Sequence, residues 1–431
     1  MRLSAIKFEN YKAFHGRQSL EIRPLTILIG RNSSGKSVVA RLPLIIARGL
    51  SESAWDPVDL EFDGMDFGAS FLDLIHGRSP HGAVGIGAKF TSKQGAEFVE
   101  FTATIQHIDE YRLQLIARFE IQGSGIPKTT LSWRGHNLME EMAEYNFEQG
   151  LLVGRCLASF HGLFPHRIQI KELNGPGQLS LFDENSRIPD LKLKLSQALE
   201  HTTYLGPFRK EPLRVYRFPG GTVRNVGIGG AKAPELLAED YSRRHGGVLR
   251  SVGDWFASHL GGWPLGIAEH KDTFSLVLTN PQKPSVEVNI ADAGTGIAQV
   301  LPLVVQRFAE YADGSRNGLE IVEQPELHLH PGVHGDLADL YIDSLSKSSS
   351  QFIIETHSEN FVLRIRRRVV EGKLDPKNVI IYWINDDNQA QRCVEAIHVL
   401  QNGDVDRWPS KIFAEDFEEV KAMRKAQEQN K

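Results

Sequence analysis

The chain has 431 residues, of which 41% are hydrophobic and 24% charged, and its formal net charge is −5 at pH 7. This is the composition of a globular protein that buries a full core, and the overall charge gives no argument for nucleic acid, although it is compatible with a local basic face. Its two cysteines, Cys156 and Cys393, are too far apart in sequence for a metal-type spacing or a disulfide framework, as expected in a reducing compartment.

The N-terminal residues alternate between apolar and charged types and contain no apolar signal-peptide core. No apolar run approaches the length that a membrane span requires. We therefore expect a cytoplasmic protein with no membrane partner.

The first thirty residues predict three strands followed by a helix. Loose alternation from Leu3 predicts the first strand, residues 19–22 the second, and the apolar run 25–29 a third that is buried on both faces. Gly30 ends this run, and residues 35–48 predict a helix that is interrupted or offset at Pro43. A strand, a glycine loop and a helix in this order form the context of a phosphate-binding loop.

The loop between this strand and helix has the spacing of a P-loop. Gly30 and Gly35 permit the tight backbone path that turns several N–H groups toward anionic oxygens. Lys36 is placed to reach the β- and γ-phosphates and the Ser37 hydroxyl to hold Mg²⁺, which predicts ATP and Mg²⁺ as cofactors. The alternative is a glycine- and serine-rich turn that happens to precede a lysine and binds no nucleotide. The predicted cofactor-binding residues here are Gly30, Asn32, Ser33, Ser34, Gly35, Lys36 and Ser37.

The middle of the chain predicts an insertion into this nucleotide-binding unit. Residues from about 65 to 135 are β-rich, with a hairpin whose strands are 97–106 and 111–121. Residues 137–200 carry helical spacing with two loop breaks, near residues 174–177 and 182–189. A glycine-rich loop at 218–230, helices in 234–260 and a strand pair follow. From Asp292 the pattern is α/β, and its last predicted strand is residues 379–384. The predicted division is a split domain of residues 1–64 and 201–431, interrupted by a β-rich lobe and helical insertion at 65–200.

A second chemical signal is an apolar strand, residues 319–322, that ends in an acid. Glu323 would lie beside the P-loop and hold Mg²⁺ directly or through water. Gln324 follows it; a glutamine orients water but cannot take its proton, so hydrolysis would be slow or would use Glu326.

Two further signals follow the same logic. His357, after the apolar strand 352–354, could hydrogen-bond the γ-phosphate, although a Thr-His-Ser at a strand end is in isolation more often a capping turn. Gly294 and Gly296 enter a helix and would form an anion site, although an ordinary N-capped helix is the default for such a pair.

The order of these motifs resembles that of the ABC-type ATPases. The P-loop comes first and the glycine pair second, followed by the strand that ends in Glu323, its Glu-Leu-His-Leu-His-Pro continuation and the Thr-His-Ser. The chain looks most similar to the prokaryotic AAA-annotated branch that includes the overcoming-lysogenisation-defect nucleases and anti-phage ATPases, with SMC-like repair ATPases as more distant relatives. The opening residues 6–14, the central Tyr-Leu-Gly-Pro-Phe-Arg at 204–209 and everything after Asp292 carry the resemblance. It implies an α/β P-loop ABC-type ATPase domain with a β-rich lobe and an inserted α/β region.

The resemblance also implies roles for single segments. Residues 294–299 would be the signature segment, which completes the nucleotide site of a partner subunit, and residues 328–331 the loop that crosses the dimer interface. Here Glu323-Gln324 replaces the usual Asp-Glu pair, and Gly-Thr-Gly replaces Ser-Gly-Gly. Binding of ATP is therefore better supported than turnover.

Three segments also allow other interpretations. Glu326 with His328, His330 and His334 could form a zinc cluster, but these residues fall where the dimer-contact loop is expected. The arginines of residues 364–368 favour a solvated helix or acidic neighbours over a nucleic-acid contact. A nuclease after His357 is disfavoured, because the remaining stretch is short and Asp386-Asp387 predicts a hairpin turn.

The sequence therefore predicts an ATPase that forms a homodimer or higher homo-oligomer on ATP and switches a separate effector protein, a nuclease or toxin, in anti-phage defence. The effector would dock on the insertion or on the 364–368 helix. The alternatives are a nucleotide-sensing scaffold with negligible hydrolysis and a DNA-processing ATPase related to SMC-like repair proteins. The catalytic candidates are Gln324, Glu326 and His357, and the Mg²⁺ candidates are Ser37 and Glu323.

Overall fold

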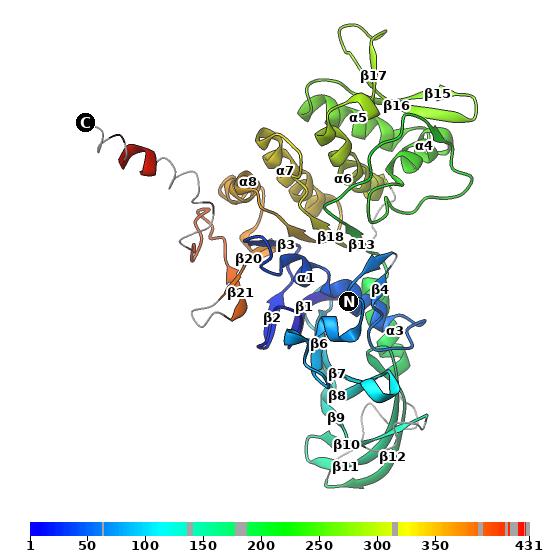
Figure 1. Ribbon diagram of the computed structural model, residues 1–431, viewed down its shortest axis with the longest axis vertical. Helices are drawn as coiled ribbons and strands as arrows, with labels where there is room; N and C mark the ends of the chain where they lie inside the picture. Colours follow the sequence, from blue (N-terminus) through cyan, green and yellow to red (C-terminus); the bar gives the residue numbers. More distant parts are fainter. Residues whose placement is uncertain are drawn as a thin grey trace.

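The fold was established from a computed structural model of the whole chain. It describes residues 1–62, 64–135, 141–176, 188–312, 318–386, 391–409, 413, 421–425 and 427. Figure 1 shows a β-rich lobe below a central sheet and a third, mixed lobe above it. The mixed α/β class predicted from the sequence is confirmed.

The central sheet has six strands in the order β13-β18-β19-β3-β20-β21. All neighbours are parallel except β20 and β21, which form an antiparallel pair. Its strands are β3 (Leu25–Gly30), β13 (Thr202–Leu205), β18 (Leu319–Glu323), β19 (Gln351–Glu355), β20 (Val379–Asp386) and β21 (Arg392–Ile397). The strands predicted from the apolar runs near residues 25, 319, 352 and 379 are therefore confirmed, because strands buried on both faces need continuous apolar runs.

Each face of this sheet packs on a different core. Side chains such as Leu28, Ile321 and Ile353 join the core that the sheet shares with the β-rich lobe. The alternate residues Ile27 and Ile354 join a second core with the helices on the other side. Those helices include α7 (Pro331–Lys347) and α8 (Glu359–Val370). Because the sheet is covered on both faces, chemistry is confined to the edge where its strands end.

The β-rich lobe is one antiparallel sheet of nine strands. β1 and β2, near the N-terminus, are hydrogen-bonded into this sheet, so the lobe is built from both sides of residue 64. The division at residues 64 and 200 stays a prediction. The strands are β1 (Arg2–Glu9), β2 (Gln18–Glu21), β6 (Ala83–Thr91), β7 (Phe98–Ile108), β8 (Leu113–Gly123), β9 (Ile126–Trp133), β10 (Ala143–Gln149), β11 (Leu152–His161) and β12 (Phe164–Asn174).

The helical interpretation of residues 137–200 is wrong for most of this segment. Three strands, β10 to β12, occupy residues 143–174, and only α3 (Ile188–Leu199) is helical. In β10 the buried side chains alternate along the strand, and pairing with β9 and β11 decides the conformation over the local preference of its glutamates and glutamine. The expected loop break near residues 182–189 lies largely outside the described residues. The hairpin of β7 and β8 is confirmed.

The third lobe holds helices α4 (Ala233–Arg243) and α5 (Gly247–His259), and both pack against α6 (Thr295–Ala312). A small antiparallel sheet lies beside them. It consists of β14 (Tyr216–Arg217), β15 (Leu265–His270), β16 (Thr273–Thr279) and β17 (Glu287–Asn289). Other elements among the described residues are α1 (Lys36–Ala40), α2 (Leu42–Leu50), β4 (Glu61–Phe62), β5 (Met65–Asp66) and several short 3₁₀ turns.

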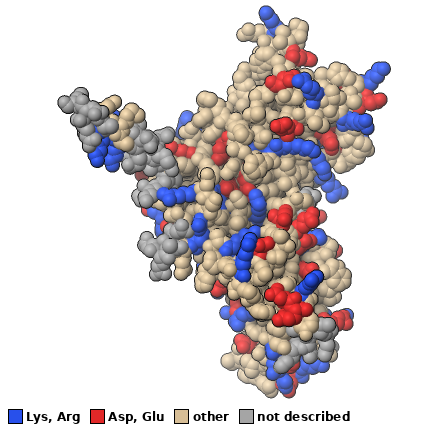
Figure 2. All heavy atoms as spheres, in the orientation of Figure 1, with Lys and Arg blue, Asp and Glu red and all other residues tan. Residues whose placement is uncertain are grey.

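The arginines of α8 have acidic partners. Arg364 and Arg368 both reach Asp339 on α7, and Arg367 pairs with Glu371 one turn further along. Figure 2 shows basic and acidic side chains interspersed over the face in view. This is the arrangement expected from acidic neighbours rather than from a phosphate-binding surface. Among the described residues, no helix is both long and apolar enough to cross a membrane.

Candidate functional site

The P-loop joins β3 to α1 at the edge where the parallel strands end. A side chain at Gly30 would come within 2.5 Å of the Ile384 carbonyl oxygen, so only glycine fits. Gly35 has a φ of 103° and packs against the Phe14 ring, a left-handed conformation that also favours glycine. Both glycines are therefore required by close approach and backbone path. Ser34 is buried, whereas Asn32 and Ser33 are exposed at the tip of the loop.

Lys36 lies inside the loop rather than in solvent. Its side chain is 3% exposed, and Nζ donates to the carbonyl oxygens of Gly30 at 3.1 Å and Arg31 at 2.8 Å. Burial lowers the Lys36 pKa, and the nearby carboxylates of Glu355, Glu326 and Glu323 oppose that shift. The Lys36 ammonium is thus held against the backbone carbonyls of its own loop.

Glu355 is a site residue that the sequence reasoning missed. It ends β19 directly opposite Glu323 at the end of β18, and its Oε2 accepts a hydrogen bond of 2.7 Å from the Ser37 hydroxyl. Its Oε1 lies 3.9 Å from Lys36 Nζ. Burial and the Glu323 charge raise the Glu355 pKa to about 7. The available signal was an acid at the end of an apolar strand, the feature that had identified Glu323.

Arg41 holds the other carboxyl. Its Nε and Nη2 bind the two carboxylate oxygens of Glu323 at 2.6 and 2.7 Å, a bidentate pair that fixes the carboxyl plane. Glu323 is buried, and the guanidinium also lies 5.5 Å from the centre of the Tyr204 ring. Burial lowers the Arg41 pKa, but the hydrogen bond and charge of Glu323 raise it more. No local sequence pattern predicts this pair.

Gln324 occupies a strained turn at the end of β18. Its φ is 47°, in the left-handed region that glutamine rarely adopts. Its N–H donates to the Glu355 carbonyl at 2.7 Å, and its own carbonyl accepts from Leu327 N–H and from Arg209 Nη2. Such a conformation persists only where the surroundings impose it, which is common at functional sites.

Glu326 and His357 are in contact. Glu326 Oε1 accepts from the His357 backbone N–H at 2.7 Å, and burial raises the pKa of this carboxyl. Burial and the charge of Lys36 lower the pKa of His357 to about 4, so its ring is neutral near pH 7. The structure thus places Ser37, Lys36, Glu323, Gln324, Glu326 and His357 in one cluster.

The glycine pair lies elsewhere, where α6 begins. Gly294 is exposed, with open space where a side chain would project. A side chain at Gly296 would come within 2.5 Å of the His328 carbonyl oxygen, so α6 packs closely on the loop after β18. Within one chain, Gly296 but not Gly294 therefore lies against the loop that was expected to cross the dimer interface.

The histidines after Glu326 are engaged in local structure. His334 Nδ1 bonds the Ser358 hydroxyl at 2.8 Å and its Nε2 the Leu329 carbonyl at 3.2 Å, while the His330 ring accepts from Gly332 N–H. Across the residues that the structure describes, no group of three or more histidine, cysteine or acidic side chains is arranged to hold a metal ion. The zinc interpretation therefore gains no support. Asp387, part of the nuclease alternative, lies outside the described residues.

One family model matches part of the chain. Residues 266–362 match the AAA ATPase domain family. The matched segment contains Gly294, Gly296, Glu323, Gln324 and His357, but not the P-loop, whose assignment rests on its own geometry. No curated protein matches the chain.

Solved structures of similar fold include three SMC heads. The SMC head domain from Thermotoga maritima has 11% identity and a TM-score of 0.42, covering 93% of this chain and 100% of that one. The SmcHead bound to the C-winged helix domain of ScpA has 12% identity and a TM-score of 0.48, covering 93% and 98%. The Smc head domain with an extended coiled coil bound to the C-terminal domain of ScpA, derived from Pyrococcus furiosus, has 11% identity and a TM-score of 0.47, covering 100% of both. Likenesses this loose transfer no residue or partner.

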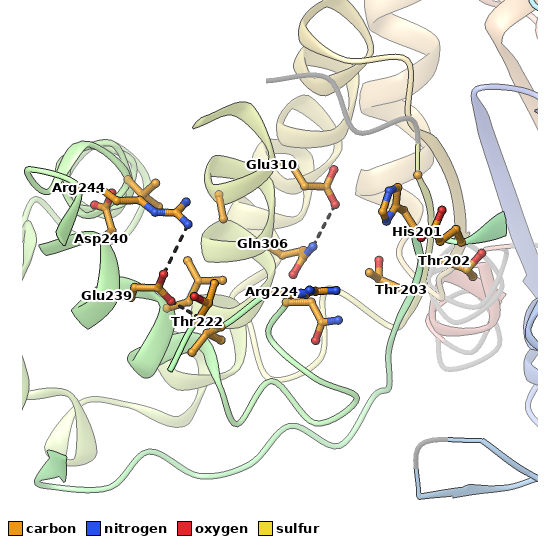
Figure 3. Close-up of a pocket in the computed structure, with 17 residues that line it drawn as sticks. His201, Thr202, Thr203, Thr222, Arg224, Glu239, Asp240, Arg244, Gln306 and Glu310 are labelled. Carbon is orange, nitrogen blue, oxygen red and sulfur yellow. Dashed lines mark hydrogen bonds and ion pairs between the residues drawn. The ribbon is translucent and has the colours of Figure 1, made fainter. Parts of the chain in front are cut away.

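A cavity of about 690 Å³ lies away from this cluster (Figure 3). It is lined by Thr202 at the start of β13 and by Gly318, just before β18, so it opens at the opposite edge of the central sheet. Its acids have internal partners: Glu239 accepts from Val223 N–H at 2.7 Å, and Glu310 accepts from Gln306 Nε2 at 3.0 Å. The cavity is therefore separate from the candidate nucleotide site.

Proposed function

We propose that this protein binds ATP with Mg²⁺ at the P-loop and hydrolyses it slowly, as an ATPase of the ABC type. The observation that carries the proposal is the convergence, at one edge of a parallel sheet, of the buried lysine, the Ser37 hydroxyl and two strand-ending carboxyls. Ligands of open α/β sheets bind at the edge where the strands end. The match of residues 266–362 to an AAA ATPase domain supports the same reading independently.

The oxygen donors of this cluster suit Mg²⁺. Ser37, Glu323 and Glu355 offer a hydroxyl and two carboxylates, the hard oxygen ligands that Mg²⁺ prefers beside phosphate. The bound ion would neutralise phosphate charge. The chain's own residues would then divide the remaining work: Lys36 holds a phosphate oxygen, Gln324 orients water, and the neutral His357 ring hydrogen-bonds the terminal phosphate.

A second candidate function is a nucleotide-sensing scaffold that barely turns ATP over. Two observations favour it: Gln324 cannot accept a proton, and the Arg41 guanidinium occupies both oxygens of Glu323. In this form of the protein, Mg²⁺ would have to share Glu323 with Arg41 or displace it. A single-turnover experiment with excess protein and radiolabelled ATP separates the two, because a scaffold binds ATP and releases it intact.

The wider role is an extension of this proposal. Nucleotide-dependent dimerisation would join the exposed Gly294 segment to the P-loop of a second copy, and closure would hold or release a separate effector protein, a nuclease or toxin, in anti-phage defence. The lobe of β6 to β12 is the part of the fold that nucleotide binding does not require, and such additions commonly carry specific contacts. Co-purification with the products of neighbouring genes tests this role; full biological activity of a lobe-deleted protein acting alone would contradict it.

A further inference from the structure

Arg209 is buried beside the strained turn of Gln324, in the loop that follows β13. Its side chain is 4% exposed, and Nη2 donates to the Glu323 carbonyl at 3.0 Å and the Gln324 carbonyl at 3.3 Å. On the other side of the turn, Gln324 N–H donates to the Glu355 carbonyl. The backbone of Glu323 and Gln324 is thus held by hydrogen bonds from both Arg209 and Glu355.

Arg209 also contacts the helix that carries the glycine pair. Gln299, on the first turns of α6, donates from Nε2 to the Arg209 carbonyl at 3.3 Å. One residue therefore joins α6 to the end of β18. A displacement of α6 by a bound nucleotide or a second copy would reach Gln324 through this residue, because the loop between them is buried at Arg209.

A buried arginine at this position lowers the stability of the fold, which argues for a role beyond stability. Its Nε and Nη1 have no hydrogen-bond partner among the described residues, and neither has Gln299 Oε1. Burial lowers the Arg209 pKa to about 10, so the environment disfavours the charged form. Buried charges with unmet hydrogen-bonding groups reduce stability, and an apolar side chain of similar volume is often tolerated better.

We propose that Arg209 is a positioning residue that sets the Gln324 turn for ATP hydrolysis and links it to helix α6. The inference rests on the ATPase function proposed above. It assigns to Arg209 no contact with nucleotide; the guanidinium acts through the two backbone carbonyls that it holds.

The test compares Arg209→Met, Arg209→Lys and, as a matched control, Arg243→Met. Arg243 is an exposed arginine on α4 whose guanidinium also donates to a backbone carbonyl, that of Pro219. In Arg209→Met we expect kcat to fall at least about tenfold, since small misplacements of a reacting group cost up to about a hundredfold. The Kd for ATP with Mg²⁺ and the melting temperature should stay at the wild-type values or improve. Arg209→Lys should recover part of kcat because an ammonium can hold one of the two carbonyls.

A second measurement does not depend on turnover. Hydrogen exchange of a peptide covering residues 319–330, without nucleotide, should be faster in Arg209→Met than in wild type and unchanged in Arg243→Met. If wild type shows no hydrolysis, the proposed ATPase function fails while the exchange result still decides whether Arg209 holds the turn. Wild-type exchange in Arg209→Met overturns the inference. So does a variant whose melting temperature and ATP affinity fall while kcat is retained, because that pattern belongs to a purely structural arginine.

Discussion

At the residue scale, the candidate site is a balance of charges around two carboxyls. Glu323 and Glu355 end neighbouring parallel strands, and both side chains are buried, so the negative charge of each carboxylate disfavours ionisation of the other. Arg41 neutralises the first, while Lys36 and the Ser37 hydroxyl partly compensate the second. Adding phosphates to this cluster without a cation would increase the repulsion, which is the physical reason to expect Mg²⁺ dependence.

Lys36→Met should weaken ATP binding by roughly 10- to 100-fold, because a charge-assisted hydrogen bond to phosphate is lost. Methionine keeps an apolar stem in the space that the lysine side chain fills, and that side chain is only 3% exposed in the wild type. Titration with a fluorescent ATP analogue measures the change, and Lys377→Met, at an exposed lysine, is the control. If a folded Lys36→Met protein bound ATP with wild-type affinity, the assignment of this loop as a P-loop would be wrong.

Glu355→Gln should weaken ATP binding in the presence of Mg²⁺ by on the order of tenfold, because an amide cannot replace a carboxylate near the cation. In EDTA the same variant should bind ATP as well as wild type or better, because a negative charge that faces phosphate is gone. Glu359→Gln, an exposed acid on the first turn of α8, should behave as wild type in both conditions. An equal loss with and without Mg²⁺ would show that Glu355 supports the loop and not the ion.

At the scale of elements, the α8 arginines are structural. Arg364 and Arg368 converge on Asp339, so they tie α8 to α7 along the outer face of the central sheet. Arg366 instead donates to the Gly403 carbonyl, at 2.8 Å, and anchors the segment after β21. A docking site for an effector on this helix would have to compete with these contacts, so the β-rich lobe is the better of the two predicted docking surfaces.

Asp339→Asn should lower the free energy of unfolding at pH 7 by about 1 kcal/mol, a value discounted because all three side chains are partly exposed. Burial raises the Asp339 pKa, but the hydrogen bonds and charges of Arg368 and Arg364 lower it more, to a net value below the ordinary one. A depressed folded-state pKa stabilises above the unfolded pKa, and that contribution is lost as the pH falls through the folded value. The difference between variant and wild type should therefore shrink below about pH 4.

Urea unfolding from pH 7 down to pH 3.5 measures this dependence. Asp343→Asn, at an exposed aspartate on the same helix, should stay within about 0.5 kcal/mol of wild type. A difference between Asp339→Asn and wild type that grows toward low pH would contradict the assigned ion pairs.

At the scale of the whole molecule, nucleotide-dependent dimerisation is the expected output. A ligand that completes its site only between two copies must stabilise the dimer. Light scattering should show a larger mass with a slowly hydrolysed ATP analogue and Mg²⁺ than without.

Gly294→Arg should abolish this increase while leaving the monomer folded, because the position is exposed and a side chain there meets no neighbour within one chain. Gly296 is a poorer probe, since any side chain would collide with the His328 carbonyl and disturb the fold itself. If Gly294→Arg still dimerised in the presence of nucleotide, the dimer interface would not include the Gly294 segment.

The sequence by itself determined several strands of the central sheet and several of the residues near their ends. Short apolar runs bounded by turn signals favour strands buried on both faces, and polar residues that end parallel strands meet at one edge of the sheet. Hence β3, β18 and β19, with Lys36, Glu323 and His357 near their ends, were predictable. It failed where pairing overrides local preference, as in β10 to β12, because the partner strands are not visible in a local pattern.

Only the tertiary structure decided how the ends of those strands are occupied. Three contacts, Ser37 with Glu355, Arg41 with Glu323 and Arg209 with Gln324, depend on bringing together residues that are far apart in the chain. Their separations are 318, 282 and 115 positions respectively. Spacing along the chain carries no information on such contacts. They follow from strand order in the sheet and from which side chains remain buried when its two faces are covered.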